Sequence, residues 1–161
     1  MSNAYYLKFG DIKGECVVDK HKDEIEVLSW NWGASNPPTI VGSGMSAGKV
    51  TMSDLSISKR VDKASLKLLE YCISGKHVTD ATLACAKSTG GKTIDDFFSI
   101  KLGEAYISSY QVGGSAGEDV GTESLSIAFR SHEADYKEQK KDGSLQSSVH
   151  HKFDHLAHKL E

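Results

Sequence analysis

Hydrophobic and polar residues alternate along most of this chain, as they do in strands that bury one face. In residues 124–129, for example, Leu125, Ile127 and Phe129 share one face, with serine and alanine on the other. Similar patterns predict further strands at residues 5–9, 25–32, 50–57, 78–86 and 97–110. The alternation slips near Ser53, where we expect a bulge or a twist. Strands at this spacing predict a mainly β domain, either an antiparallel barrel or a sandwich.

One segment changes to the period of a helix. Its apolar residues are three and four positions apart, at Leu66, Leu69, Cys72 and Ile73. This spacing predicts one short α-helix at about residues 64–74, whose apolar stripe, including Leu66 and Leu69, belongs to the core. Asp62 is suited to cap the start of the helix, and Gly75 to end it. The helix could close one end of a barrel or cover one face of a sandwich.

A long, extended loop is predicted at residues 36–47. Asn36 is followed by Pro37 and Pro38, which cannot continue a strand ladder, and glycines keep the rest mobile. Loops of this length inside a compact domain are often functional. Residues 39–41 form an apolar patch within it. Such a patch is ordinary if its own domain buries it, and it suits a neighbouring subunit if it is exposed.

Length and charge narrow the class of protein. The 161 residues suffice for one domain with its own core, so we expect a single domain over residues 1–161, with a tail at 144–161. There are 19 basic and 22 acidic residues, the net charge is −3, and the basic residues are scattered, so nucleic-acid binding is not indicated. No signal peptide is recognisable, and no apolar run approaches the roughly 18 residues of a membrane span. We therefore expect a protein made in the cytosol that, if exported, leaves by a route that reads no such signal.

The three cysteines do not form a recognisable framework. Cys16, Cys72 and Cys85 are odd in number and widely spaced, and none belongs to a CxxC pair. This argues against a set of disulfides and against a zinc ribbon. Cys72 and Cys85 lie in apolar patterns, so we interpret them as small buried hydrophobic residues.

Residues 86–93, AKSTGGKT, fit a relaxed phosphate-binding loop in which Ala86 replaces the first glycine. In such a loop Lys92 would hold the outer phosphates and Thr93 a magnesium ion. The chemistry also requires a helix to begin there, whereas the following residues are strand-like and carry two acids, Asp95 and Asp96, near their start. We interpret the segment as a hairpin turn with its two glycines at the tip. A small phosphate- or nucleotide-binding domain is the alternative.

Histidines gather near the carboxyl end, at His150, His151, His155 and His158. If residues 149–160 were helical, the last three would share one side and could bind zinc or copper. A metal-responsive module is therefore a second alternative. A solvated polar face is the ordinary interpretation of the same pattern.

No catalytic constellation emerges from the sequence. The acids Asp54, Asp62, Asp95 and Asp96 have no partner at a fixed spacing, and the many serines follow the strand alternation. The G-x-S-x-G turn that exposes a nucleophilic serine is absent from the sequence. We therefore expect neither an enzyme nor a cofactor.

Several short motifs follow one another in a distinctive order. They are KGE at 13–15, IEVLSWNWG at 25–33, GKV at 48–50, DLSI at 54–57, VDKAS at 61–65, SGKH at 74–77, ISSY at 107–110 and TESL at 122–125. Together, over about residues 5–143, they resemble the haemolysin-coregulated protein (Hcp) family, the tube-forming component of bacterial type VI secretion. The segment after Gly143 is the least similar part.

The resemblance implies a small antiparallel β-barrel of two sheets with a lateral helix. It also implies six-membered rings, each a homo-hexamer, that stack into a tube inside a contractile sheath, tipped by a spike protein of the VgrG type. Members of the family stay cytoplasmic until firing and are then secreted without a signal peptide. Their ring lumens hold effector proteins as cargo, which they carry and chaperone. Nothing in the resemblance implies nucleic-acid binding, membrane insertion, catalysis or a cofactor.

The resemblance assigns provisional roles to individual residues. The loop would supply the subunit interface through Pro37, Pro38, Thr39, Ile40, Val41 and Met45. Strand alternation separates Asn31, expected toward the lumen, from Trp30 and Trp32, expected in the core. Exposed tryptophan rings forming a ligand platform are the alternative. At the carboxyl end, the resemblance favours an extended segment over a helix, with Phe153 and Asp154 replacing a Trp-Asp pair.

Overall fold

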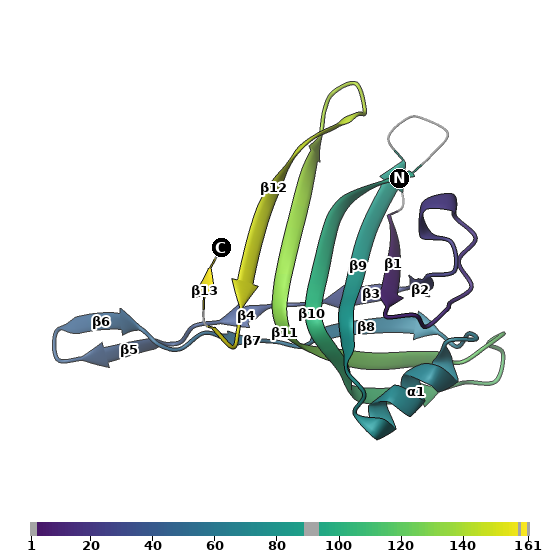
Figure 1. Ribbon diagram of the computed structural model, residues 1–161, viewed down its shortest axis with the longest axis horizontal. Coiled ribbons are helices and arrows are strands. Elements are labelled where there is room, and N and C mark those ends of the chain that lie inside the picture. Colours follow the sequence, from purple (N-terminus) through teal and green to yellow (C-terminus); the bar gives the residue numbers. More distant parts are fainter. Residues whose placement is uncertain (1–2, 89–93, 158, 161) are drawn as a thin grey trace.

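Two long strands, β10 (Ile94–Gly113) and β11 (Thr122–Gln139), run through the whole structure and bend between its two parts (Figure 1). They pair with each other along most of their length, with one irregularity between Ile107 and Ser109. The computed structural model describes residues 3–88, 94–157 and 159–160. Within those ranges every pairing between named strands is antiparallel.

One part of the sheet runs from the carboxyl end of the chain to its amino end. Its strands lie in the order β13 (Lys159–Leu160), β12 (Leu145–Asp154), β11, β10, β9 (Val78–Ser88), β1 (Ala4–Phe9) and β2 (Ile25–Val27). A single turn of 3-10 helix, Asp19–His21, lies on the connection from β1 to β2. The extended interpretation of the carboxyl end is therefore correct as far as Asp154, and a helix there is excluded.

The other part is built from β3 (Ser29–Asn31), β8 (Leu55–Arg60) and the first half of β11. Strand β2 leads almost directly into β3, and the Leu28 amide donates a 2.7 Å hydrogen bond to the Ser58 carbonyl. This contact brings the two ends of the sheet together, so the strands form a nearly closed barrel. The predicted antiparallel barrel with one lateral helix is confirmed.

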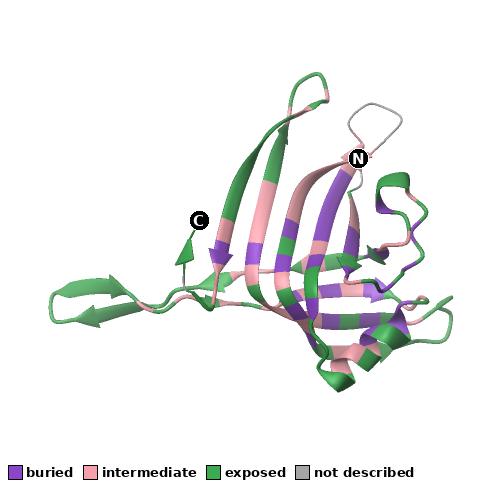
Figure 2. Cartoon of the chain, in the orientation of Figure 1, coloured by how far each residue is buried: buried purple, intermediate pink, exposed green. Residues whose placement is uncertain are grey.

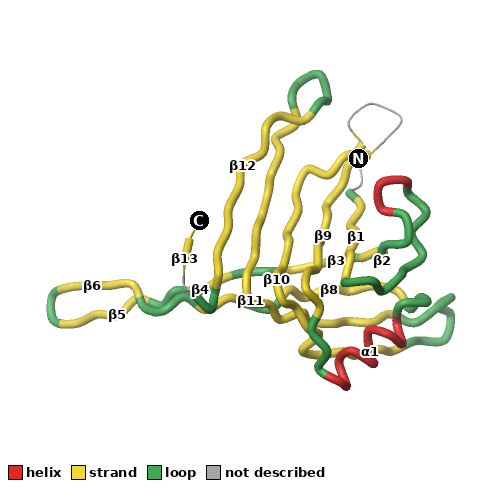
Figure 3. The backbone as a smooth tube through the Cα atoms, in the orientation of Figure 1, coloured by secondary structure: helices red, strands yellow, loops and turns green. Residues whose placement is uncertain are grey.

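Two small two-stranded sheets stand apart from the barrel (Figure 1, Figure 3). Strands β4 (Ala34–Ser35) and β7 (Thr51–Met52) pair beside it, and β5 (Pro38–Val41) and β6 (Gly44–Ala47) form a hairpin beyond them. The predicted slip near Ser53 corresponds to the break between β7 and β8.

Apolar side chains from alternating positions of the strands fill the barrel. Figure 2 shows buried and more exposed residues alternating along the barrel strands. The fully buried core residues include Leu7, Phe9, Ile25, Leu55, Leu83, Ile100, Leu102, Ile107, Leu125 and Ile127. Burial at every second residue is the reason that the sequence pattern located most strands correctly. In the described part of the chain, the single α-helix is too short and too polar to cross a membrane.

Helix α1 (Ser65–Ser74) lies against the outside of the sheet and ends at Gly75, whose φ of 66° forms the expected left-handed cap (Figure 1). Its inward residues are Ser65 and Leu68, both buried. The expectation that Leu66 belongs to the core is wrong, because its side chain is 76% exposed, and Leu69 is only half-buried. The period was right, but the phase is set by contacts of Ser65 with the sheet.

The start of the helix also differs from the expectation. Ala64 occupies the cap position, and Asp62 lies two residues before it. The Asp62 carboxylate nevertheless accepts a 2.9 Å hydrogen bond from the Ala64 amide. Asp62 therefore still satisfies a backbone donor of the turn that leads into the helix.

Candidate functional site

The hairpin β5–β6, here called the arm, projects away from the barrel (Figure 1). All of its residues are exposed, and Figure 2 shows it in a single exposed colour. Ile40, Val41 and Met45 are 73%, 73% and 74% exposed. Residues 33–48 contain no Asp, Glu, Lys or Arg, in a chain that is 25% charged. The arm is thus an apolar and uncharged projection that its own domain does not cover.

The arm corrects the prediction of an irregular loop at residues 36–47. Pro38 begins a strand and lies opposite Ala47, because a two-stranded hairpin has an open side where a proline costs no hydrogen bond. Gly42, with a φ of 60°, forms the tight turn between Val41 and Gly44. Of the two open alternatives for the apolar patch, burial within the same domain is excluded. The six residues expected at an interface therefore lie on or beside an exposed arm.

A second surface is a sheet face made of uncharged polar residues, here called the serine face. It consists of Ser29, Asn31, Ser56, Ser58, Ser109, Gln111, Ser124 and Ser126, from strands β3, β8, β11 and β10. The residues form two rows across the four strands, since Ser58 lies opposite both Ser29 and Ser124. In the second row Ser56 lies opposite both Asn31 and Ser126. A groove of about 310 Å³ runs over this face, and none of the described residues that line it is charged.

The two tryptophans lie on the side of the strand opposite to Asn31. Trp30 stacks on Phe98 at a ring distance of 5.8 Å, and Trp32 packs against Phe129 and the core. Both rings are half-buried. An exposed aromatic platform for a ligand does not fit this packing, whereas Asn31 is exposed on the serine face.

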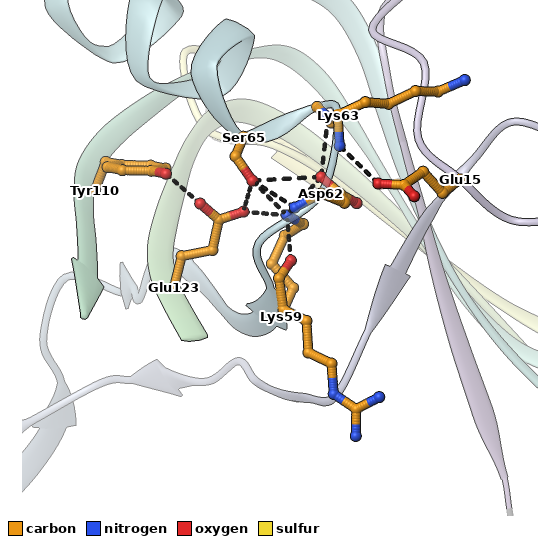
Figure 4. Close-up of polar contacts among 9 residues, drawn as sticks. Glu15, Lys59, Asp62, Lys63, Ser65, Tyr110 and Glu123 are labelled. Carbon is orange, nitrogen blue, oxygen red and sulfur yellow. Dashed lines mark hydrogen bonds and ion pairs between the residues drawn. The ribbon is translucent and has the colours of Figure 1, made fainter. Parts of the chain in front are cut away.

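A buried polar network holds helix α1 on the barrel (Figure 4). Lys59 on β8 and Glu123 on β11 are both fully buried and form an ion pair. Lys59 Nζ also donates to Asp62 at 2.9 Å and to the Arg60 carbonyl at 2.8 Å. Ser65 at the start of the helix donates to Glu123 at 2.7 Å. The network thereby ties the first turn of the helix to two strands.

The network fits a structural role rather than a catalytic one. The second carboxylate oxygen of Glu123 accepts a hydrogen bond from the Tyr110 hydroxyl, so each oxygen of that carboxylate has a partner. Burial, and then the hydrogen bond to Glu123, raise the pKa of Tyr110. The Lys59 amine is likewise enclosed, since it contacts Glu123, Asp62 and the Arg60 carbonyl and its side chain is fully buried. The sequence did carry a signal for this pair, since both residues occupy inward positions of their strands.

The histidines of the carboxyl end do not lie on one helical face. His151 and His155 contact His132 of β11, a buried residue that sequence reasoning missed. His150 points elsewhere and pairs with Asp135, and His158 lies outside the described residues. No group of three or more side chains suited to a metal ion exists among the residues that the structure describes.

The phosphate-loop alternative fails on the elements that flank it. Strand β9 extends to Ser88, and the next element, β10, starts at Ile94 and pairs antiparallel with β9. The required helix does not follow. Residues 89–93, which include the expected glycine tip, lie outside the described residues. The antiparallel pairing on either side is that of a hairpin.

The thiols are free and mostly shielded. Cys16 and Cys85 are buried, and Cys72 is half-buried on the helix. Burial raises the pKa of Cys85 to about 12 and also raises that of Cys16. Neither of these two groups forms the thiolate that a reactive cysteine needs at neutral pH.

The fold and these surfaces can be compared with known proteins. Residues 6–136 match the family described as "Type VI secretion system effector, Hcp". The chain is 41% identical to Protein hcp1 of Pseudomonas aeruginosa over 145 residues, which cover 89% of each protein. A solved type six secretion system protein superimposes with a TM-score of 0.92 at 29% identity, covering 99% of this chain and all of that one. Hcp1 from Salmonella typhimurium superimposes with a TM-score of 0.79 at 26% identity, over the full length of both.

These matches span nearly the whole chain and agree with one another and with the barrel described above. That family consists of type VI secretion tube and effector proteins and is not a known family of enzymes. The chain belongs to the Hcp family of type VI secretion proteins.

Proposed function

We propose that this protein is a structural subunit of the type VI secretion tube, which assembles as hexameric rings that stack on one another. The observation that carries the proposal is the arm, with Ile40, Val41 and Met45 each about three-quarters exposed. Apolar side chains held out in this way gain free energy when a partner removes them from water, at about 25 cal/mol per Å². In a homo-oligomer the natural partner is a second copy of the chain.

The shape of the arm supports a head-to-tail interface. An arm on one copy needs a receiving surface elsewhere on the next copy, which makes the contact heterologous. Such contacts close into a ring when the rotation between copies divides a full turn, and they otherwise continue as a filament. Within a six-membered ring the contacts are of the closing kind, and between stacked rings they are of the kind that continues as a filament. Pro37 and Pro38 lead into the exposed patch, and together with Thr39 they would supply the rest of the interface.

The serine face is the proposed wall of the ring lumen, with Asn31 among its exposed residues. Hydroxyl and amide groups bind water and carry no net charge, so they attract neither acidic nor basic cargo strongly. A lumen that holds effector proteins in transit benefits from such a wall. The same subunit could therefore carry and chaperone effectors as well as build the tube.

The remaining partners follow from this role. A VgrG-type spike would tip the tube and a contractile sheath would surround it. The protein would stay in the cytoplasm until firing and then leave without a signal peptide. Its mechanism would be assembly and release, with no bond chemistry and no cofactor.

Light scattering after size-exclusion chromatography tests the proposal directly. We expect a species of six 17.5 kDa chains, joined by longer stacks at high concentration. Val41→Asp should weaken the ring or abolish the stacks, because a carboxylate would be buried at the interface. Leu66→Asp is the matched control, since Leu66 is an equally exposed apolar residue on helix α1. A monomer at every concentration, or a Val41→Asp variant that assembles like the wild type, would contradict the proposal.

A further inference from the structure

Three imidazoles form one hydrogen-bonded chain where the end of β12 meets β11. His132 Nε2 lies 2.9 Å from His151 Nε2, and His132 Nδ1 lies 3.1 Å from His155 Nε2. His132 is 2% exposed, with Trp32 at a ring distance of 4.9 Å and Phe153 at 5.8 Å. Because the central ring uses both nitrogens on different neighbours, the three side chains cannot converge on a single metal ion in this arrangement.

The hydrogen atoms shared among the three imidazole rings can be counted. Each nitrogen–nitrogen contact needs one hydrogen, and a neutral His132 supplies one donor and one acceptor. When all three rings are neutral, both hydrogen bonds can therefore form, with one flanking ring donating to His132 and the other accepting from it. If His151 and His155 are both protonated, each presents an N–H to His132, which would have to lose both of its own hydrogens. That state of an imidazole does not occur near neutral pH, so one contact must break.

A carboxylate lies beside one flanking ring but not beside His132. The Asp154 carboxylate interacts with the charge of His155, and Lys159 on β13 lies opposite Asp154. The carboxylate of Asp154, next to His155, accepts hydrogen bonds from the backbone amides of Leu156 and Ala157 and also faces Arg130. Elsewhere along β11 and β12, Glu133 pairs with Lys152 at 3.7 Å, and Asp135 pairs with His150 at 2.9 Å. On β10, the residue opposite His132 is Leu102, and β3 leads to Trp32. These elements place aromatic and aliphatic groups, rather than a carboxylate, against His132.

The cluster holds a defined piece of the chain. Phe153, 8% exposed, and the turn after it are attached to β11 through His132 and through the His155 amide, which donates 2.8 Å to the Arg130 carbonyl. Strand β13 in turn pairs with Phe153 and Asp154. The same segment forms one wall of a pocket of about 560 Å³, and the opposite wall includes residues at the base of the arm. Detachment of this segment from β11 would therefore remove one wall of the pocket beside the arm.

We propose that His132, His151 and His155 form a pH-sensitive latch that fastens residues 151–157, together with strand β13, to the barrel. At neutral pH the latch is closed. When acid protonates both flanking rings, the segment detaches from β11 while the barrel remains folded. Histidine is suited to this role because its ordinary pKa, near 6.5, lies between neutral and mildly acidic conditions.

Hydrogen–deuterium exchange of the full-length protein at pH 7.5 and pH 5.0, corrected for intrinsic exchange rates, tests the latch. We expect peptides covering residues 145–157 to lose protection at least tenfold at pH 5.0, while peptides from β1 and β9 keep theirs. In His151→Gln the side-chain amide can either donate or accept, so protonation of His155 alone no longer breaks a hydrogen bond to His132. We therefore expect the loss of protection at pH 5.0 to disappear. His150→Gln is the matched control, because His150 is adjacent but outside the cluster, and it should behave as the wild type does.

Three results would overturn the proposal. They are equal protection of the segment at both pH values, a loss in His151→Gln as large as in the wild type, or a loss that spreads equally to β1 and β9. His151 is exposed, so the glutamine variant should fold normally at pH 7.5. If it does not, His155→Gln removes the other flanking titratable group and gives the same expected result.

Discussion

Lys59 and Glu123 lie directly opposite each other on strands β8 and β11, and both side chains are completely buried. Their charges are matched within the protein rather than by solvent, and Asp62, Ser65 and Tyr110 complete the hydrogen bonding. A buried ion pair of this kind is costly to break from one side only, because the remaining charge has no partner.

We therefore expect Lys59→Met to lower the free energy of unfolding by about 3–5 kcal/mol, and Glu123→Gln to lower it as well. The double variant Lys59→Met/Glu123→Leu should lose less than Lys59→Met alone, since no buried charge of this pair remains. Urea unfolding measures all three. The exposed pair Lys67–Glu70 provides the control, and Glu70→Gln should change stability by less than about 0.5 kcal/mol. Equal losses at the buried and exposed pairs would contradict the role assigned to the network.

The orientation of helix α1 gives a second prediction. Leu68 is fully buried, whereas Leu66 is 76% exposed, although both are leucines in the same short helix. Leu68→Ala should cost about 2–5 kcal/mol, because it removes buried methyl groups and leaves a cavity. Leu66→Ala should cost less than about 0.5 kcal/mol, as surface substitutions usually do. Urea unfolding of the two variants checks the phase of the helix, and a larger loss for Leu66→Ala would mean that the helix is rotated.

The same helix explains what the sequence could and could not predict. Spacing along a helix is a local property, so the period and the glycine at the end were readable. The phase depends on Ser65 bonding to Glu123, which is 58 residues away in the sequence. No local pattern contains that information. The sequence did contain one indication of this polar contact: Lys59 and Glu123 are ionisable residues at inward positions of their strands.

The strands and surfaces likewise include features that local sequence predicts and features that only long-range contacts determine. Alternation located the barrel strands because burial on one face repeats every second residue. The arm was predicted as a loop because its two strands bury neither face and so lack that pattern. Its turn, with Gly42 first, was the signal that could have identified a hairpin. His132 was missed because its partners come from β12 and the turn beyond it, which only the folded sheet brings together.

Stability should depend on pH through His132. Burial, and then the charges of His151 and His155, lower the pKa of His132 from 6.5 to about 4. Between those values the unfolded chain binds a proton that the folded chain excludes. This contribution to stability is therefore complete above pH 6.5, and it is lost as the pH falls toward 4, by up to about 3 kcal/mol.

Urea unfolding at pH 7.5, 5.5 and 4.5 measures that loss. In His132→Phe the ring keeps its bulk but cannot titrate, so we expect a shallower decline over the same range. His77→Phe is the matched control, because His77 also stacks on an aromatic ring, Tyr106, but is exposed. Parallel curves for the wild type and His132→Phe would show that another group governs the acid sensitivity.

The proposed position of Asn31 on the lumen wall of a ring can be tested by adding charge and bulk at this residue. Asn31 is exposed on the serine face; Ser56 lies opposite it on β8, and Ser126 lies opposite Ser56 on β11. If this face lines a water-filled lumen, Asn31→Arg adds a solvated guanidinium without burying it, so monomer stability and ring mass should both stay unchanged. If the face instead packs against another subunit, the buried charge should split the ring. Light scattering distinguishes the two results, and Val41→Arg on the arm serves as the comparison that should disrupt assembly. Loss of the ring in Asn31→Arg, with normal unfolding in urea, would move the lumen to another face of the barrel.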